Sequence, residues 1–145
     1  RFAITPNAQE LWVTNELAAS ISVISLKDFS VVATIALQLK GARASDITPV
    51  GLTMTRDGKR AYVTMGRANH VAFIDVAKRE VTQQVLVGKR PWSLALSDDE
   101  SRLYVVNVHH GTIGRSGAAA LTPWAILLQG LHAHFAPLKC GQEGI

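Results

Sequence analysis

The chain has 145 residues, of which 48% are hydrophobic and 18% charged, with a formal net charge of +4. This length predicts one ordinary domain, and the absence of any run of about 18 apolar residues excludes a membrane-spanning helix. Its basic residues are scattered over predicted turns and form no stripe, so nucleic acid is not an expected partner. The single Cys140 excludes an intrachain disulfide and any metal site built from several cysteines.

Residues 1–113 predict short strands joined by tight turns, in the manner of an antiparallel meander. A first set of four strands is expected at residues 2–5, 10–15, 20–26 and 30–37, and a second set at 50–55, 60–65, 70–76 and 80–87. A third set begins at 92–97 and 102–107, and residues 108–113 fit the start of its third strand.

The second strand of each set carries one repeated pattern, centred on the aromatic residues Trp12, Tyr62 and Tyr104. Their spacings are 50 and 42 residues, and the shorter one is typical of a four-stranded propeller blade. Residues 2–37 align with 52–87 without a gap, and 49–62 align with 91–104. The extra residues therefore form an insertion at 38–48. Coincidence between ordinary strands and common Asp-Gly turns is the weaker alternative.

The repeat stops after Ile113, and residues 114–145 show no strand alternation. A short helix is expected at 125–131, after Thr122 and Pro123. The tail also contains His132, His134 and Cys140, which would suit a metal, but a divergent cap, a shifted reading frame or a vector-derived tail is the favoured interpretation.

The sequence thus predicts an all-β chain, a β-propeller fragment of about two and a half four-stranded antiparallel blades at 1–37, 49–87 and 91–113. An irregular or short-helical tail follows at 114–145. An open arc of this kind exposes unpaired strand edges and apolar faces, so self-association or a longer parent chain is expected.

The second unit resembles the YVTN-type β-propeller repeat in its Asp57-Gly58 turn, its strand at 61–65 and its strand at 71–75. Residues 47–58 and 66–71 are most similar to the subgroup associated with pyrroloquinoline-quinone-dependent alcohol catabolism. The resemblance implies a periplasmic or secreted protein of about seven blades. It also implies an accessory role near a quinoprotein dehydrogenase or cytochrome, with no cofactor and no established catalytic residues.

Antiparallel connectivity places the loops between second and third strands, and those between units, at one face. Titratable and hydrogen-bonding groups on these loops can converge at the funnel of a propeller, where binding is expected. The candidate binding residues at or beside this face are Arg43, Asp46, Arg67, Asn69, His70, Arg90, Trp92 and His109. Each also has a plain structural interpretation, as a turn former, an exposed loop residue or interblade packing. No catalytic or metal-binding residue is predicted.

Three functions agree with this pattern. The favoured one is a non-enzymatic periplasmic binding or scaffold protein, accessory to quinoprotein alcohol oxidation. A propeller enzyme, such as a lactonase or a haem or metal oxidoreductase, is the alternative, for which the loops offer His70, His109 and His110 but few acidic residues beyond Glu16 and Asp46. A purely structural adhesion module is the third, and the insertion argues mildly against it.

Overall fold

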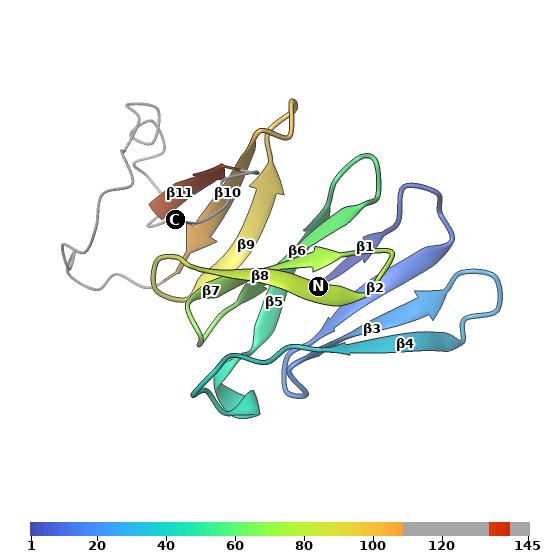
Figure 1. The fold of residues 1–145 in the computed structure, drawn as a ribbon, viewed down its shortest axis with the longest axis horizontal. Coiled ribbons are helices and arrows are strands. Elements are labelled where there is room, and N and C mark those ends of the chain that lie inside the picture. The colour runs from blue at the N-terminus through green and yellow to red at the C-terminus, as the bar shows by residue number, and fades with distance from the viewer. Residues whose placement is uncertain (109–133, 140–145) are drawn as a thin grey trace.

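The computed structural model describes residues 1–108 and the strand at residues 134–139, and it consists of three antiparallel sheets (Figure 1). The first contains β1 (Phe2–Ile4), β2 (Glu10–Asn15), β3 (Ser20–Ser25) and β4 (Val31–Ala36). The second contains β5 (Pro49–Met54), β6 (Arg60–Met65), β7 (His70–Asp75) and β8 (Glu80–Leu86). The third contains β9 (Pro91–Leu96), β10 (Arg102–Asn107) and β11 (His134–Lys139), and a single 3-10 turn, η1 (Ala44–Asp46), lies in the insertion.

The first strands of the three sheets lie next to one another, because β5 contacts both β1 and β9. The other strands follow outward in chain order within each of the two four-stranded sheets. This is the arrangement of propeller blades around an axis, so the predicted fold class is confirmed. No helix among the described residues is long and apolar enough to cross a membrane.

The backbone repeats from blade to blade as the gapless alignment predicts. Left-handed φ values recur at corresponding positions: Ala8, Gly58 and Glu100; Ala19 and Asn69; Phe29 and Arg79; Thr48 and Arg90. A register shift also recurs, at Val23/Ile24 in the first sheet and at Phe73/Ile74 in the second. Because the corresponding residues with left-handed φ differ in side chain, their recurrence reflects a repeated backbone conformation rather than one preferred residue.

Two apolar cores lie between successive blades. Between the first and second blades the buried side chains are Trp12, Ile21, Val23 and Ile35 on one side and Ala61, Val63, Met65, Ala72 and Ile74 on the other. Between the second and third blades they are Tyr62 and Val71 against Leu94, Leu103 and Val105. The repeated aromatic residues Trp12 and Tyr62 are both fully buried and each faces the following blade.

The threonine of the repeated pattern links each blade to the next. The hydroxyl of Thr14 donates to the carbonyl of Val50 at 3.1 Å, and that of Thr64 to the carbonyl of Trp92 at 3.5 Å. The Thr64 hydroxyl also accepts from the Gly51 N–H at 2.6 Å. A Cβ on Gly51 would lie 2.9 Å from the Trp92 carbonyl, so the close approach of the two inner strands requires glycine there.

The prediction that the tail lacks strands was wrong for β11. This strand pairs antiparallel with β10, from Arg102↔Lys139 to Asn107↔His134. The backbone N–H and C=O groups at the free edge of β10 can form hydrogen bonds with almost any extended segment. Side-chain alternation was therefore a poor guide to whether the tail contains a strand. Residues 108–113 were expected here instead. Val108 is not in a strand, and residues 109–113, like the helix expected at 125–131, lie outside the described residues.

Candidate functional site

The connections of the propeller fall on two faces, as antiparallel connectivity requires. We call the face with residues 16–19, 37–48, 66–69 and 87–90, together with Arg1 beside the first of these loops, the loop-rich face, and the face with the remaining turns the turn face. On the loop-rich face, neighbouring loops share backbone hydrogen bonds. The Leu37 N–H donates to Ala19 at 2.8 Å, Val87 to Asn69 at 2.8 Å, and Gly66 to Thr48 at 2.9 Å. These bonds hold the loops as one ordered surface.

Three of the predicted site residues meet where the second blade adjoins the third. The Asn69 side-chain oxygen accepts from the Arg90 N–H at 2.8 Å, which ties the two loops together. The Arg90 guanidinium lies 5.9 Å from the centre of the half-buried Trp92 ring, within range of a cation–π contact. Asn69 is therefore a loop-fixing residue, as one interpretation of the sequence held, while Arg90 and Trp92 form a cationic and aromatic platform.

Arg67 and His70 lie on the same face in the β6–β7 connection. The Arg67 N–H donates to the Thr48 hydroxyl at 2.8 Å, and its exposed side chain is left to face solvent. The His70 ring nitrogen Nδ1 lies 2.6 Å from the Ala68 carbonyl. Because a carbonyl only accepts hydrogen bonds, this contact assigns the hydrogen of the neutral ring to Nδ1 and leaves Nε2 as the acceptor.

Arg43 and Asp46 pair with each other in the insertion. Arg43 Nε lies 3.1 Å from Asp46 Oδ2, on side chains that are 87% and 39% exposed. The hydrogen bond from Arg43 is the main reason that the pKa of Asp46 is lowered from 3.8. The insertion is anchored through Ile47, which is buried in the core between the first two blades. His109, the remaining candidate, lies outside the described residues.

Charge is distributed unequally between the two faces. Among residues 1–108, the loop-rich face carries six basic residues, Arg1, Lys40, Arg43, Arg67, Lys89 and Arg90, and two acidic ones, Glu16 and Asp46. The turn face carries seven basic residues, Lys27, Arg56, Lys59, Arg60, Lys78, Arg79 and Arg102, and eight acidic ones, Glu10, Asp28, Asp57, Asp75, Glu80, Asp98, Asp99 and Glu100. All six basic side chains of the loop-rich face are exposed, so this face attracts anions.

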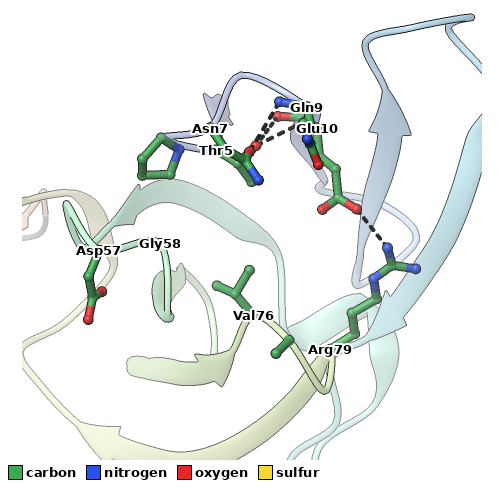
Figure 2. Close-up of a pocket in the computed structure, with 10 residues that line it drawn as sticks. Thr5, Asn7, Gln9, Glu10, Asp57, Gly58, Val76 and Arg79 are labelled. Atoms are coloured by element: carbon green, nitrogen blue, oxygen red, sulfur yellow. Dashed lines mark hydrogen bonds and ion pairs between the residues drawn. The ribbon is translucent and has the colours of Figure 1, made fainter.

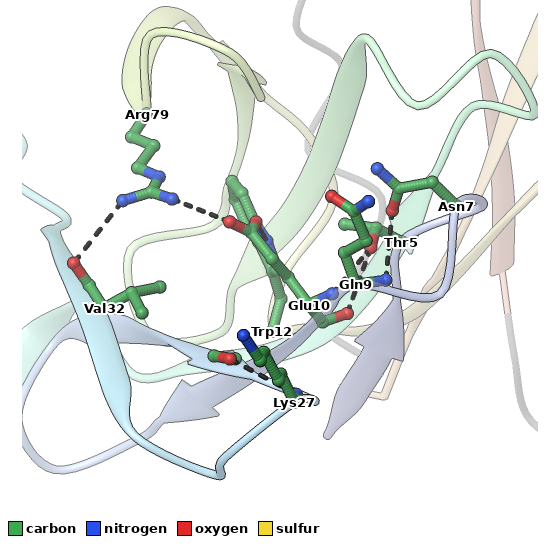
Figure 3. Close-up of polar contacts among 9 residues, drawn as sticks. Thr5, Asn7, Gln9, Glu10, Trp12, Lys27, Val32 and Arg79 are labelled. Carbon is green, nitrogen blue, oxygen red and sulfur yellow. Dashed lines mark hydrogen bonds and ion pairs between the residues drawn. The ribbon is translucent and has the colours of Figure 1, made fainter.

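The turn face holds a polar cluster that the sequence interpretation missed (Figure 3). Arg79 Nη2 in the second blade lies 2.7 Å from Glu10 Oε1 in the first, and the Trp12 indole donates to Glu10 Oε2 at 3.0 Å. Arg79 also reaches the Val32 carbonyl at 3.5 Å. The sequence did contain one signal for this cluster. Glu10 departs from the repeat, because the corresponding positions in the other two blades are Arg60 and Arg102.

A hollow of about 440 Å³ opens beside this cluster, between the first two blades (Figure 2). Thr5, Gly58 and Val76 line it together with Glu10 and Arg79. Glu10 and Arg79 already form an ion pair with each other across the interface between the two blades. The cluster is therefore best explained as a contact that holds the two blades together. Among residues 1–108, no three His, Cys, Asp or Glu side chains come together in a way that could hold a metal ion.

A family model described as a YNCE-like beta-propeller matches residues 2–102. The chain belongs to this β-propeller family. The match confirms the predicted propeller repeat at the level of the family. The pyrroloquinoline-quinone subgroup stays a prediction, and the comparison with curated proteins gives no match.

Solved structures show that other propellers share the fold. A hydrazine synthase of Kuenenia stuttgartiensis is 20% identical with a TM-score of 0.66, over 74% of this chain and 28% of that one. A protein from Lactobacillus plantarum is 19% identical with a TM-score of 0.64, over 74% and 34% of the two chains. A candidate 6-phosphogluconolactonase of Bacteroides fragilis is 16% identical with a TM-score of 0.64, over 74% and 31%. This propeller chain therefore spans about a third of their length, and these likenesses show the fold alone.

The Ser97–Asp99 turn of this propeller gives a pH-dependent prediction. Ser97 and Ser101 hydroxyls donate to the Asp99 carboxylate at 2.6 and 2.7 Å, and they lower its pKa from 3.8 to about 2, Ser97 contributing most. Because the folded pKa lies below the unfolded one, the stabilisation from this turn is complete above pH 3.8 and is lost as the pH falls towards 2. Ser97→Ala should raise the Asp99 midpoint in a carboxyl ¹³C NMR titration. An unchanged midpoint would contradict this explanation.

Proposed function

We propose that this chain is the binding part of a non-enzymatic β-propeller protein, which docks an acidic partner on its loop-rich face. The observation that carries this proposal is the unequal distribution of charge, with six exposed basic residues against two acidic residues on that face. A concentrated positive field accelerates encounters with a negatively charged surface and favours its correct orientation. Shared backbone hydrogen bonds between the loops supply the rigidity that such a surface needs.

The proposed partner is a periplasmic quinoprotein dehydrogenase or its cytochrome, and the proposed location of the protein is therefore the periplasm. Support comes from where the subgroup resemblance falls in the fold. Residues 66–71 form the β6–β7 connection and the start of β7, and residues 47–48 end the insertion. Thr48 and Arg67 join these two segments by the hydrogen bond described above. Part of the subgroup resemblance therefore falls on the loop-rich face.

Charge reversal tests this proposal. Arg67→Glu with Lys89→Glu changes two exposed side chains of the loop-rich face without removing a side-chain contact of the core. We expect the affinity for a purified quinoprotein dehydrogenase or cytochrome to fall about tenfold or more at low ionic strength, measured by surface plasmon resonance. The loss should shrink at higher salt, because exposed charges more than about 8 Å apart are largely screened at physiological ionic strength.

Lys27→Glu with Lys59→Glu is the matched control, since it makes the same change of charge at two exposed positions of the turn face. Its affinity should stay within about twofold of the parent protein. Equal losses for the two variants would show that net charge, and not the loop-rich face, governs binding. No binding of either partner by the unchanged protein would reject the partner class.

A propeller enzyme is the second candidate function. It is favoured by the names of two structures with the same fold, hydrazine synthase and a candidate 6-phosphogluconolactonase. In this case the platform of Arg90 and Trp92, with Asn69 beside it, would hold an anionic substrate at the loop-rich face. Metal analysis and an absorbance scan of the purified protein distinguish the candidates. A stoichiometric metal or haem would favour the enzyme.

A further inference from the structure

Three side chains at the loop-rich end of the interface between the second and third blades depart from the internal repeat. Compared with the interface between the first two blades, the corresponding residues are Ala19 and Asn69, Thr48 and Arg90, and Val50 and Trp92. An amide, a guanidinium and an indole therefore stand together where the first interface has an alanine, a threonine and a valine. Arginine and tryptophan are among the residue types that contribute most to the affinity of protein interfaces.

The backbone is nevertheless the same at the two interfaces. The carbonyls of Ala19 and Asn69 each accept a backbone hydrogen bond at 2.8 Å, and those of Thr48 and Arg90 accept one at 2.9 and 3.1 Å. All four residues have a positive φ, between 43° and 59°. Because the first interface forms without the amide and the guanidinium, the propeller backbone does not require the side chains of Asn69 and Arg90.

Arg90 is held in place from two sides. Its N–H donates to the Asn69 side-chain oxygen at 2.8 Å, a bond that Ala19 cannot make at the first interface. Its guanidinium lies 5.9 Å from the centre of the Trp92 ring. Trp92 is half-buried, so the ring is itself supported by the fold. An arginine that is ordered before binding loses less conformational entropy when it binds, which increases affinity.

The guanidinium of Arg90 still has its hydrogen-bond donors available. Among residues 1–108 it makes no hydrogen bond or ion pair, whereas Arg43 on the same face is paired with Asp46. Stacking on a ring uses the flat face of a guanidinium and leaves the N–H groups at its edge. That edge matches the two oxygens of a carboxylate, or two oxygens of a phosphate.

The backbone around Arg90 favours a carboxylate over a phosphate. Phosphate sites are commonly built from several backbone N–H groups that point at one anion. The N–H groups of these loops that already donate within the protein are those of Gly66, Arg67, Asn69, Val87 and Arg90. A carboxylate needs only the one guanidinium edge that Arg90 offers.

We propose that Arg90, held over the Trp92 ring, is the anchor of the loop-rich face and binds a carboxylate side chain of the acidic partner through two parallel hydrogen bonds. This inference rests on the proposed function, because it names the group by which that partner is held. Arg67 and Lys89 act at a distance through their charge. Arg90 differs from them because its contribution depends on the shape of its side chain and not only on its charge.

Substitutions that keep the charge test this inference. Arg90→Lys retains the positive charge and loses the planar fork, so we expect its dissociation constant for a synthetic hexaglutamate peptide to rise about tenfold. Trp92→Leu keeps the net charge and an apolar side chain but removes the ring, and its dissociation constant should rise about fivefold. Binding is measured from the shifts of backbone ¹H–¹⁵N NMR signals of the 145-residue chain, and circular dichroism checks that each variant keeps its strands.

Arg67→Lys is the matched control. It makes the same change at an exposed arginine of the same face that lies over no aromatic ring of residues 1–108. Its dissociation constant for hexaglutamate should change by less than about twofold. Equal effects of Arg67→Lys and Arg90→Lys would overturn the inference, because the face would then bind through its total charge alone.

Two further probes identify the group that is recognised. A hexaglutamine peptide has the same length without carboxylates, and it should not bind. The dissociation constant for inorganic phosphate should differ by less than about twofold between Arg90→Lys and the parent protein. Phosphate binding that weakens as much as hexaglutamate binding in Arg90→Lys would overturn the assignment to a carboxylate.

The same variants, tested against a purified quinoprotein dehydrogenase or cytochrome, separate this inference from the proposed function. If Arg67→Glu with Lys89→Glu weakens binding of the partner but Arg90→Lys does not, the proposed function stands and the inference is overturned. If hexaglutamate binding depends on Arg90 but neither protein binds, the carboxylate site stands and the partner class is rejected. No binding of hexaglutamate by the unchanged protein would overturn the inference.

Discussion

Trp12→Ala is expected to lower the free energy of unfolding by about 3–5 kcal/mol. Trp12 is 0% exposed and lies in the core between the first and second blades. Both sheets that enclose it are fixed by backbone hydrogen bonds, so they can close only part of the resulting cavity. The change also removes the indole that donates to Glu10 at 3.0 Å. Urea unfolding followed by circular dichroism measures the loss.

Two further variants make this prediction specific. Leu17→Ala removes an apolar side chain that is 92% exposed, and it should change stability by less than about 0.5 kcal/mol. Trp12→Tyr should lose less than Trp12→Ala, because tyrosine occupies the corresponding positions in the other two blades, Tyr62 and Tyr104. A loss below about 1 kcal/mol for Trp12→Ala would show that packing between the blades contributes little to the fold.

Glu10→Ala is expected to cost about 1.5–3 kcal/mol, the range for hydrogen bonds to a charged group. Glu10 binds Arg79 at 2.7 Å across the seam, and their side chains are only 23% and 35% exposed. Removal of the carboxylate leaves the Arg79 charge partly buried without its ion-pair partner, and it leaves the Trp12 indole without an acceptor. Urea unfolding of Glu10→Ala, Arg79→Ala and the double variant would measure the coupling between the two charges.

Lys59→Ala is the matched control for this pair. Lys59 lies 3.8 Å from Asp57, but these side chains are 80% and 54% exposed. Solvent screens such a pair, so the expected cost is below about 0.5 kcal/mol. If the losses in unfolding free energy from Glu10→Ala and Arg79→Ala were simply additive, this would contradict the interpretation that the contact between the two charges holds the blades together.

Much of the fold could be predicted from the sequence because the repeat is local and almost gapless. Turn residues such as Asp57 and Gly58 define each blade, and the spacing of Trp12, Tyr62 and Tyr104 defines how many blades there are. The prediction failed at β11, because the tail does not follow the repeat there. The shared location of the loop-rich connections followed from antiparallel connectivity alone, and their binding role stays a prediction.

The sequence by itself determined the order and direction of the strands, since alternation and turn chemistry act over a few residues. Only the tertiary structure decided which residues meet across the interface between two blades. Glu10 and Arg79 are 69 residues apart in the chain, and Thr14 and Val50 are 36 apart. Their contact depends on how one sheet is rotated and displaced against the next. That geometry is fixed by the packing of whole apolar sheet faces, and it cannot be predicted from a local sequence pattern.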